Sequence, residues 1–223
     1  MRYCVFNGSP RGKGGNTYIL LKKVVEGIES TGSPEIVWFH LKDAQDREDA
    51  PKAFRTADVA VLGFPLYTDA MPGLTKAFIE GLAPFEGLEG NPRMAFLVQS
   101  GFPEARHSRF VERYLEKLAQ RLNANYAGSV IKGGCEGVRI RPEEMNQALF
   151  NRLYELGADL AQAGMFTQER LQQLAKPERY PRILAPLFRL VLCLPATQTY
   201  WISQLKRNGA YDARGAQPFV SED

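Results

Sequence analysis

A short apolar run passes directly into a glycine-rich loop in Arg2-Tyr3-Cys4-Val5-Phe6-Asn7-Gly8-Ser9-Pro10-Arg11-Gly12-Lys13-Gly14-Gly15-Asn16-Thr17. Residues 17–28 then place apolar side chains at helical spacing, so the loop joins a predicted strand to a predicted helix, with Asn16 or Thr17 expected as its cap. Amides at a helix end, hydroxyls and cations are the groups that bind phosphate. The loop therefore predicts a phosphate site; an ordinary glycine-rich turn is the alternative.

Short apolar runs alternate with longer amphipathic segments over the first 164 residues, a pattern typical of a parallel sheet with crossover helices. Strands are predicted at residues 2–6, 35–40, 59–63, 93–99 and 126–131. Helices with one apolar face are predicted at residues 17–28, 72–82, 104–122 and 143–163. The sequence thus predicts an α/β fold, with a doubly wound five-stranded parallel sheet in a three-layer α/β/α sandwich.

Three well-known phosphate loops do not match this segment. A Walker loop requires four residues between its first glycine and Gly-Lys, but only three separate Gly8 from Gly12. A dinucleotide fingerprint that starts at Gly12 would need a glycine in place of Thr17 and an acidic residue after the second strand, and neither is present. In a tyrosine-phosphatase loop five residues separate Cys from Arg, whereas six separate Cys4 from Arg11. An NTPase, a Rossmann NAD site and a phosphatase are therefore disfavoured.

Two later segments follow the phosphate loop in a recognisable order. The first is Ala57-Asp58-Val59-Ala60-Val61-Leu62-Gly63-Phe64-Pro65-Leu66-Tyr67, and the second is Met71-Pro72-Gly73-Leu74-Thr75-Lys76-Ala77-Phe78-Ile79-Glu80. With the Gly8-Ser9-Pro10-Arg11 and Asn16-Thr17 pairs, they resemble the flavodoxin-like NAD(P)H-dependent FMN reductase family over roughly residues 1–165. The resemblance implies a flavodoxin-like fold that binds FMN.

The resemblance also implies how three loops share the flavin. The first loop would hold the FMN phosphate, the second would lie along the isoalloxazine and the ribityl chain, and residues 99–104 would border the far side of the ring. The implied FMN-binding residues are Ser9, Arg11, Asn16, Thr17, Pro65, Leu66, Tyr67, Thr68, Met71, Ser100, Gly101 and Phe102. No metal site is expected.

Flavin chemistry needs flat apolar walls more than acid–base groups, because the cofactor itself accepts the hydride. Tyr67, Met71 and Phe102 can supply such walls; the alternatives are that Tyr67 is only an edge aromatic and Met71 only an ordinary residue at a helix start. Asp69 and Glu104 are expected to cap the helices that follow them. No catalytic side chain is assigned.

The three cysteines, Cys4, Cys135 and Cys193, have no CxxC spacing, which argues against disulfide frameworks, zinc sites and iron–sulfur clusters. Iron–sulfur members that share these loops carry a cysteine cluster, so a single flavin centre is implied here. Cys135 has no resolving cysteine nearby and is expected to pack or form a wall. With no readable signal peptide, the expected location is the cytoplasm.

The formal net charge is +3, and the excess lies in residues 169–223, which hold 8 Lys and Arg against 5 Asp and Glu. No nucleic-acid-binding signature accompanies it, so no nucleic-acid partner is expected. The apolar stretch at residues 183–195 contains Arg189 and is shorter than the roughly 20 residues needed to cross a bilayer. No transmembrane segment is predicted.

The expected activity is an FMN-dependent oxidoreductase in which NADPH or NADH gives hydride to flavin N5, followed by reduction of a small quinone, flavin, nitro or azo acceptor. A nearly neutral core favours this over a flavodoxin that carries single electrons, since such carriers are usually strongly acidic. Two alternatives stay open: an electron-transfer protein that serves a redox partner, and a flavin-free domain that binds another phosphorylated ligand.

Residues 166–223 fall outside the resemblance, so the expected division is an FMN-binding domain at residues 1–165 and a C-terminal helical extension at residues 166–223. The extension begins with a predicted helix at residues 168–175, and its apolar middle at residues 183–194 is too long to stay uncovered in water. We expect it to pack on the domain or in a homodimer contact. A membrane surface is the third possible cover.

Overall fold

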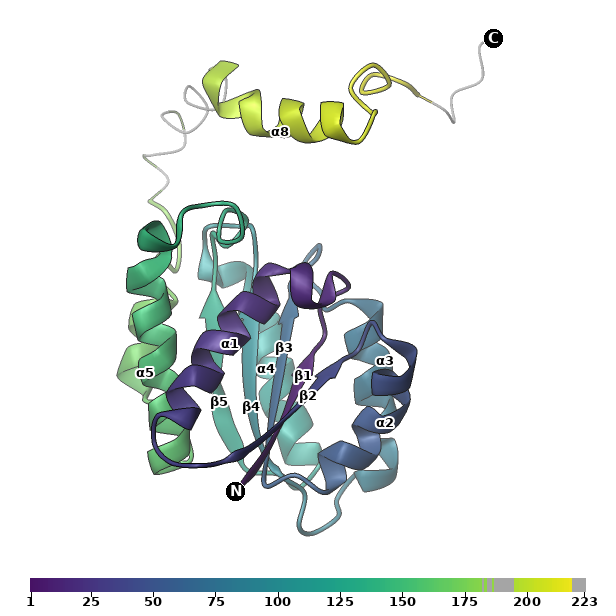
Figure 1. Cartoon of the computed structure of the whole chain (residues 1–223), viewed down its shortest axis with the longest axis vertical. Coiled ribbons are helices and arrows are strands. Elements are labelled where there is room, and N and C mark those ends of the chain that lie inside the picture. The colour runs from purple at the N-terminus through teal and green to yellow at the C-terminus, as the bar shows by residue number, and fades with distance from the viewer. Residues whose placement is uncertain (182, 184–185, 187–194, 218–223) are drawn as a thin grey trace. The chain divides into compact units, whose positions relative to one another are not determined.

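The computed structural model describes residues 1–181, 183, 186 and 195–217 (Figure 1). The chain divides into two compact units, Met1–Arg179 and Tyr180–Asp223. The first unit contains the sheet and every residue of the predicted FMN site.

The first unit is built on one five-stranded parallel sheet with the order β2-β1-β3-β4-β5. The strands are β1 (Arg2–Asn7), β2 (Glu35–His40), β3 (Val59–Pro65), β4 (Arg93–Gln99) and β5 (Tyr126–Lys132). All five predicted strands are confirmed, and three of them run one or two residues further at their carboxyl ends. The strand order is that of flavodoxin-like folds, so the predicted fold class is confirmed.

Helices cover both faces of the sheet. The helices α1 (Asn16–Glu29) and α5 (Gln147–Ala163) lie side by side on one face, as Figure 1 shows. The helices α2 (Ala44–Arg55), α3 (Gly73–Gly81) and α4 (Arg109–Arg121) cover the other. The strands inside the sheet therefore bury both of their faces: in β1, Cys4 packs into one core and Val5 into the other, whereas the edge strand β2 is only half-buried over most of its length. The predicted three-layer sandwich is confirmed.

Close contact between α1 and α5 depends on two glycines. A Cβ on Gly27 would overlap the backbone carbonyl of Tyr154, and a Cβ on Gly157 would overlap that of Val24. The two backbones therefore touch, which fixes the position of α1 and of the loop before it.

The sequence patterns missed α2, which connects β2 to β3. Its buried face is narrow, consisting of Ala50, Ala53 and Phe54, and Pro51 interrupts its polar sequence. Short 3-10 turns also open two of the predicted helices: η3 (Ala105–Ser108) precedes α4, and η4 (Glu143–Asn146) precedes α5. The remaining 3-10 turns are η1 (Gly12–Gly14) and η2 (Ala83–Phe85).

The first unit continues beyond α5 to Arg179. Phe166 is 1% exposed, and Leu171 and Leu174 of α6 (Gln168–Leu174) are also buried in the core that α1 and α5 share. Residues 166–179 therefore complete the core of the first unit.

The second unit contains α8 (Pro195–Arg207). The ammonium of Lys206, in the last turn of α8, and the Arg214 guanidinium both lie over the ring of Tyr211, at 5.1 and 4.0 Å from its centroid. Most of the apolar stretch at residues 183–194 lies outside the described residues. In the part of the chain that the structure describes, no helix is long and apolar enough to span a bilayer.

Candidate functional site

The glycine-rich loop lies at the carboxyl end of β1, between its two neighbours β2 and β3. The chain order of the strands reverses at this point, and ligands of open α/β sheets bind at such a switch point. The carboxyl ends of β3, β4 and β5 bring three further loops to the same edge of the sheet.

Backbone contacts fix the start of the loop. The Gly8 N–H donates to the carbonyl of Gly63 at 2.7 Å, and the buried Thr75 hydroxyl donates to the carbonyl of Gly8 at 3.1 Å. A Cβ on Gly8 would overlap that hydroxyl, so only glycine fits without a shift of its neighbours. The loop is thus attached to both β3 and α3.

Polar side chains hold the loop from inside. Asn7 accepts a hydrogen bond from the Ser9 N–H at 3.1 Å, and its amide nitrogen lies 3.2 Å from Nδ1 of His40. Burial, assisted by the nearby Lys13 charge, lowers the pKa of His40, which keeps the imidazole neutral and able to accept from Asn7. The Ser9 hydroxyl in turn accepts from the Arg11 N–H at 3.3 Å. The sequence patterns did not identify Asn7 or His40.

The N-cap of α1 is Gly15, so the expectation that Asn16 or Thr17 caps the helix was wrong. A side chain on Gly15 would crowd Ser9, because its Cβ would come within 2.8 Å of the Ser9 hydroxyl oxygen. No side chain among the described residues caps this helix, and the first N–H groups of a helix have no partner within it. They face the loop and suit an anion.

The side chains of Asn16 and Thr17 are engaged elsewhere. The Asn16 amide donates to the carbonyl of Cys135 at 2.7 Å and accepts from the Arg139 N–H at 3.1 Å. Thr17 is fully buried, and its hydroxyl accepts from the Gln99 amide at 3.2 Å. Both residues join neighbouring loops to the phosphate loop through their side chains.

A surface hollow, here called the switch-point hollow, lies where these loops meet. It is lined by Ser9, Arg11, Asn16, Pro65, Leu66, Tyr67, Gln99, Ser100, Gly101 and Glu136. Eight of these are predicted site residues; Gln99 opens the loop expected to border the ring and Glu136 lies in the loop after β5, but neither was predicted to bind FMN. Four predicted residues, namely Thr17, Thr68, Met71 and Phe102, do not line it. The structure therefore brings most of the predicted residues together.

The loop after β3 turns back on itself beside the hollow. Tyr67 and Ala70 exchange backbone hydrogen bonds of 2.8 and 3.1 Å. Between them, Thr68 and Asp69 have φ angles of 48° and 63°, in the left-handed region that costs energy for residues other than glycine. This turn projects Tyr67, which is 48% exposed, at the rim, while Met71 packs against the core.

The loop after β4 is joined to the loop after β5. The Ser100 N–H donates to the carbonyl of Lys132 at 3.0 Å, and the Gly134 N–H donates to the carbonyl of Phe102 at 2.9 Å. Phe102 remains 45% exposed and stacks on His107, with 4.7 Å between ring centroids. An exposed aromatic ring thus stands beside Gly101 of the switch-point hollow.

His107 connects two of the loops around the hollow. Its Nδ1 lies 3.6 Å from a carboxylate oxygen of Asp69, and its Nε2 lies 3.6 Å from one of Glu104. The expectation that Asp69 caps the following helix was wrong, since Pro72 is the N-cap of α3. Glu104 does occupy the N-cap position of η3, but its side chain makes no capping hydrogen bond. The two carboxylates instead flank an imidazole that the motifs did not reveal.

Cys135 belongs to the loop after β5, and its side chain is buried. It is 1% exposed, and burial is the main cause that raises the pKa of its thiol to about 12. The thiol is therefore protonated at neutral pH and a poor nucleophile, in agreement with the packing role expected from the sequence.

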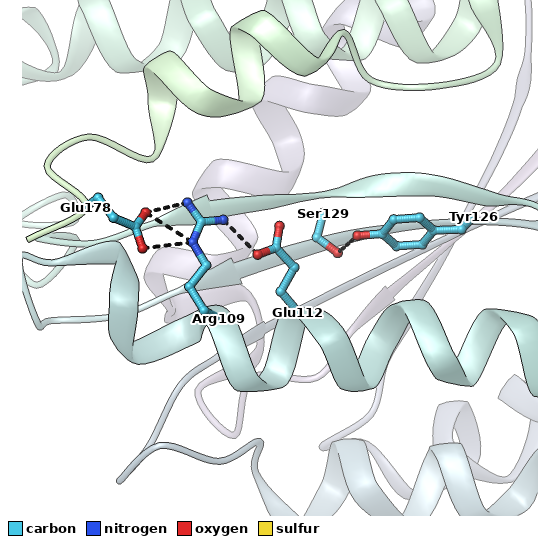
Figure 2. A network of polar contacts seen from close by, with 5 residues as sticks. All are labelled: Arg109, Glu112, Tyr126, Ser129 and Glu178. Atoms are coloured by element: carbon cyan, nitrogen blue, oxygen red, sulfur yellow. Dashed lines mark hydrogen bonds and ion pairs between the residues drawn. The ribbon is translucent and has the colours of Figure 1, made fainter.

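A strap at residues 176–179 runs along the loop after β4. The N–H groups of Ala105 and Arg106 donate to the carbonyls of Pro177 and Glu178 at 3.0 and 3.2 Å. Figure 2 shows the Arg109 guanidinium held between Glu178 and Glu112, at 2.6 and 2.7 Å. The hydrogen bonds from Arg109, assisted by its charge, lower the pKa of Glu178. The chain thus leaves the first unit beside the loop that carries Phe102.

The same view contains a second polar pair on β5. The Tyr126 hydroxyl donates to the Ser129 hydroxyl at 2.8 Å, and burial raises the pKa of the phenol to about 12 (Figure 2). The bond gives each of the two hydroxyls on β5, beneath α4, a hydrogen-bond partner. The pair lies apart from the residues that line the hollow.

The family model for the flavodoxin-like fold matches residues 1–156, and the chain belongs to that family. The resemblance that the loop motifs predicted is thereby confirmed. No curated protein sequence matches the chain.

Solved structures with the same fold include several flavin enzymes. An FMN-dependent NADH-azoreductase from Bacillus anthracis, in complex with FMN, is 16% identical with a TM-score of 0.57, over 72% of this chain and 99% of that chain. An NADH:FMN oxidoreductase, EMOB, is 17% identical with a TM-score of 0.56, over 79% and 96%. An NAD(P)H:quinone oxidoreductase from Methanothermobacter marburgensis is 12% identical with a TM-score of 0.55, over 72% and 96%. At these identities the likeness shows the fold.

Proposed function

We propose that the chain is an FMN-dependent NAD(P)H oxidoreductase that reduces a small quinone, flavin, nitro or azo compound. The observation that carries the proposal is the switch-point hollow, in which a glycine-rich anion loop and loops bearing exposed aromatic rings share one edge of the sheet. The descriptions of the structural neighbours as azoreductases and quinone reductases support the same kind of reaction.

The phosphate end of FMN fits the loop at residues 8–17. The helix N-terminus behind Gly15, the Ser9 hydroxyl and the exposed Arg11 guanidinium would bind a single phosphate. Asn16 and Thr17 would contribute their backbone N–H groups and, through their side chains, the rigidity of the surrounding loops. The loop suits one terminal phosphate, which favours FMN over FAD.

The ring end of FMN fits the opposite part of the hollow. Pro65, Leu66 and Gly101 line an apolar edge there, and Tyr67 stands exposed at its rim. The Ser100 N–H is already bonded to Lys132, so Ser100 and Phe102 would act by shaping the wall. Bound FMN supplies the hydride-accepting chemistry, and the protein supplies position and surroundings. The proposal therefore assigns no catalytic side chain.

Reconstitution with flavins tests the cofactor. The purified protein is stripped of any flavin and titrated with FMN, FAD and riboflavin while flavin fluorescence is followed. Tight binding of FMN, weaker binding of FAD and much weaker binding of riboflavin are expected, because the phosphate loop provides much of the affinity. Failure of all three flavins to bind would favour the alternative of a flavin-free phosphate-binding domain.

Anaerobic reduction then separates an enzyme from an electron carrier. Addition of NADPH or NADH to the FMN-loaded protein should bleach the flavin absorption within the time of mixing, and an added quinone should restore it. A flavin that is bound but not reduced by either nicotinamide would contradict the reductase and favour the carrier.

A further inference from the structure

A second, larger hollow of about 350 Å³ lies between α1 and the start of α5. Its apolar wall is formed by Ile19, Val138 and Phe150. Four cationic side chains, those of Lys13, Lys22, Lys23 and Arg141, also line it, together with the carboxylate of Glu143 and the polar side chains of Tyr18 and Asn146. We call it the basic hollow.

Most of the positive charge in the basic hollow is uncompensated. Lys23 is paired, since its ammonium lies 2.9 Å from Glu26 and 3.7 Å from Glu143. Among the described residues, Lys13, Lys22 and Arg141 have no carboxylate within 4.0 Å. Clustered cations without partners repel one another, so a bound anion would relieve that repulsion.

One loop separates the basic hollow from the switch-point hollow. Glu136 of this loop lines the switch-point hollow, whereas Val138 and Arg141 line the basic hollow. Asn16 fixes the loop by its bonds to the backbone at residues 135 and 139. Lys13 belongs to the phosphate loop itself, so the two hollows are immediate neighbours.

We propose that the basic hollow binds the adenosine 2′-phosphate of NADPH, so that the enzyme prefers NADPH to NADH. This inference rests on the proposed function, which requires a nicotinamide nucleotide beside FMN. A phosphate monoester carries about −1.5 to −2 charges at neutral pH and pairs best with Arg and Lys. The apolar wall suits the adenosine, and Lys22 and Arg141 suit the phosphate that distinguishes the two nucleotides.

Calorimetry with adenosine 2′,5′-bisphosphate tests the site directly, with 5′-AMP as the ligand that lacks the 2′-phosphate. The titrations use the full-length protein with and without FMN, so a result is obtained whether or not flavin binds. We expect the bisphosphate to bind about tenfold more tightly, the size of one good charge-assisted contact. Equal affinities for the bisphosphate and 5′-AMP would overturn the proposal in favour of a general anion site. So would displacement of both ligands by inorganic phosphate to the same extent.

Charge-removing variants locate the contact. Lys22→Gln and Arg141→Gln should each weaken the binding of the bisphosphate about three- to tenfold and leave the binding of 5′-AMP unchanged. The effect is modest because both side chains are exposed and their charges are partly screened. Lys52→Gln, an exposed lysine on α2 across the sheet, is the matched control and should change neither ligand. Unaltered affinity in both hollow variants would overturn the assignment.

Steady-state kinetics separates this inference from the proposed function. The ratio of kcat/KM for NADPH to that for NADH should exceed about ten in the native enzyme and fall in Arg141→Gln, with NADH kinetics unchanged. If FMN binds and both nucleotides reduce it equally, the inference fails and the proposed function stands. If neither nucleotide reduces bound FMN, the proposed function fails.

Discussion

The Thr75 hydroxyl donates a hydrogen bond to the Gly8 carbonyl, and it occupies the space that a Cβ on Gly8 would need. One contact therefore both fixes the phosphate loop on α3 and restricts its first position to glycine. Because the same contact determines the shape of the proposed FMN site, stability and cofactor binding are coupled through it.

Gly8→Ala should lower both the stability of the fold and the affinity for FMN. The added methyl must displace a buried hydroxyl, and overpacking of this kind costs about 1–3 kcal/mol of unfolding free energy. Gly14→Ala is the matched control in the same loop, since a Cβ there meets nothing within 4 Å. Urea unfolding and FMN titration measure the two effects. Equal behaviour of the two variants would show that the Thr75 contact does not constrain the loop.

Arg11→Gln should weaken FMN binding by about 1–2 kcal/mol, roughly five- to thirtyfold in affinity, because one exposed cation at the phosphate is lost. Glu136→Gln should act in the opposite direction, since it removes a negative charge from the hollow that holds the anionic cofactor. Both changes in FMN affinity should become smaller at high salt, because salt screens the charges involved. Fluorescence titration measures them, and unchanged affinity in Arg11→Gln would mean that the phosphate lies elsewhere.

The sequence predicted the central strands because they bury both faces and are therefore uninterrupted apolar runs, as in Val59–Pro65. The half-buried edge strand Glu35–His40 was predicted from its short run of apolar and β-branched residues. The eight predicted lining residues came from the family resemblance of three loops, and the parallel sheet explains why those loops meet at one edge. The sequence could not reveal that Asn16 and Thr17 are bonded to residues far away in the chain, nor that His107 reaches Asp69, since those contacts depend on loop conformations set by tertiary packing. The helix α2 was missed because only three of its side chains are buried.

Cys135→Ser should preserve NADPH-dependent turnover, since the buried thiol is not a redox group in the proposed reaction. Its effect should appear in the pH dependence of stability. Burial raises the folded pKa to about 12, so above about pH 8.5 only the unfolded thiol ionises and the unfolding free energy falls with rising pH. The fall contributed by this thiol is about 1.4 kcal/mol per pH unit, and the serine variant should lack it.

Urea unfolding of native protein and of the variant at pH 8 and pH 10 compares the two slopes. Parallel loss of stability in both proteins would show that other groups, such as Tyr3 with its raised pKa, account for the alkaline effect. Loss of turnover in the variant with FMN still bound would contradict the packing role.

A chain that ends at Gly164 should fail to fold stably. It lacks Phe166, Leu171 and Leu174, three buried side chains worth about 1.5–3 kcal/mol each, against a total stability of about 5–15 kcal/mol for a typical domain. A chain that ends at Arg179 keeps them and keeps the strap on Ala105 and Arg106, and should retain FMN. Circular dichroism and flavin content compare the two. Cooperative unfolding of the shorter chain would refute this account.

The shortened chain that ends at Arg179 also tests how residues 180–223 are covered. These residues carry an apolar stretch and, in α8, an exposed Trp201, surfaces that isolated soluble chains rarely leave open. We predict that they form the contact of a homodimer, so the full chain should sediment as a dimer and the chain ending at Arg179 as a monomer with FMN bound. If both sediment as monomers, the tail does not make a dimer. If only the full chain floats with liposomes, a membrane surface is its cover.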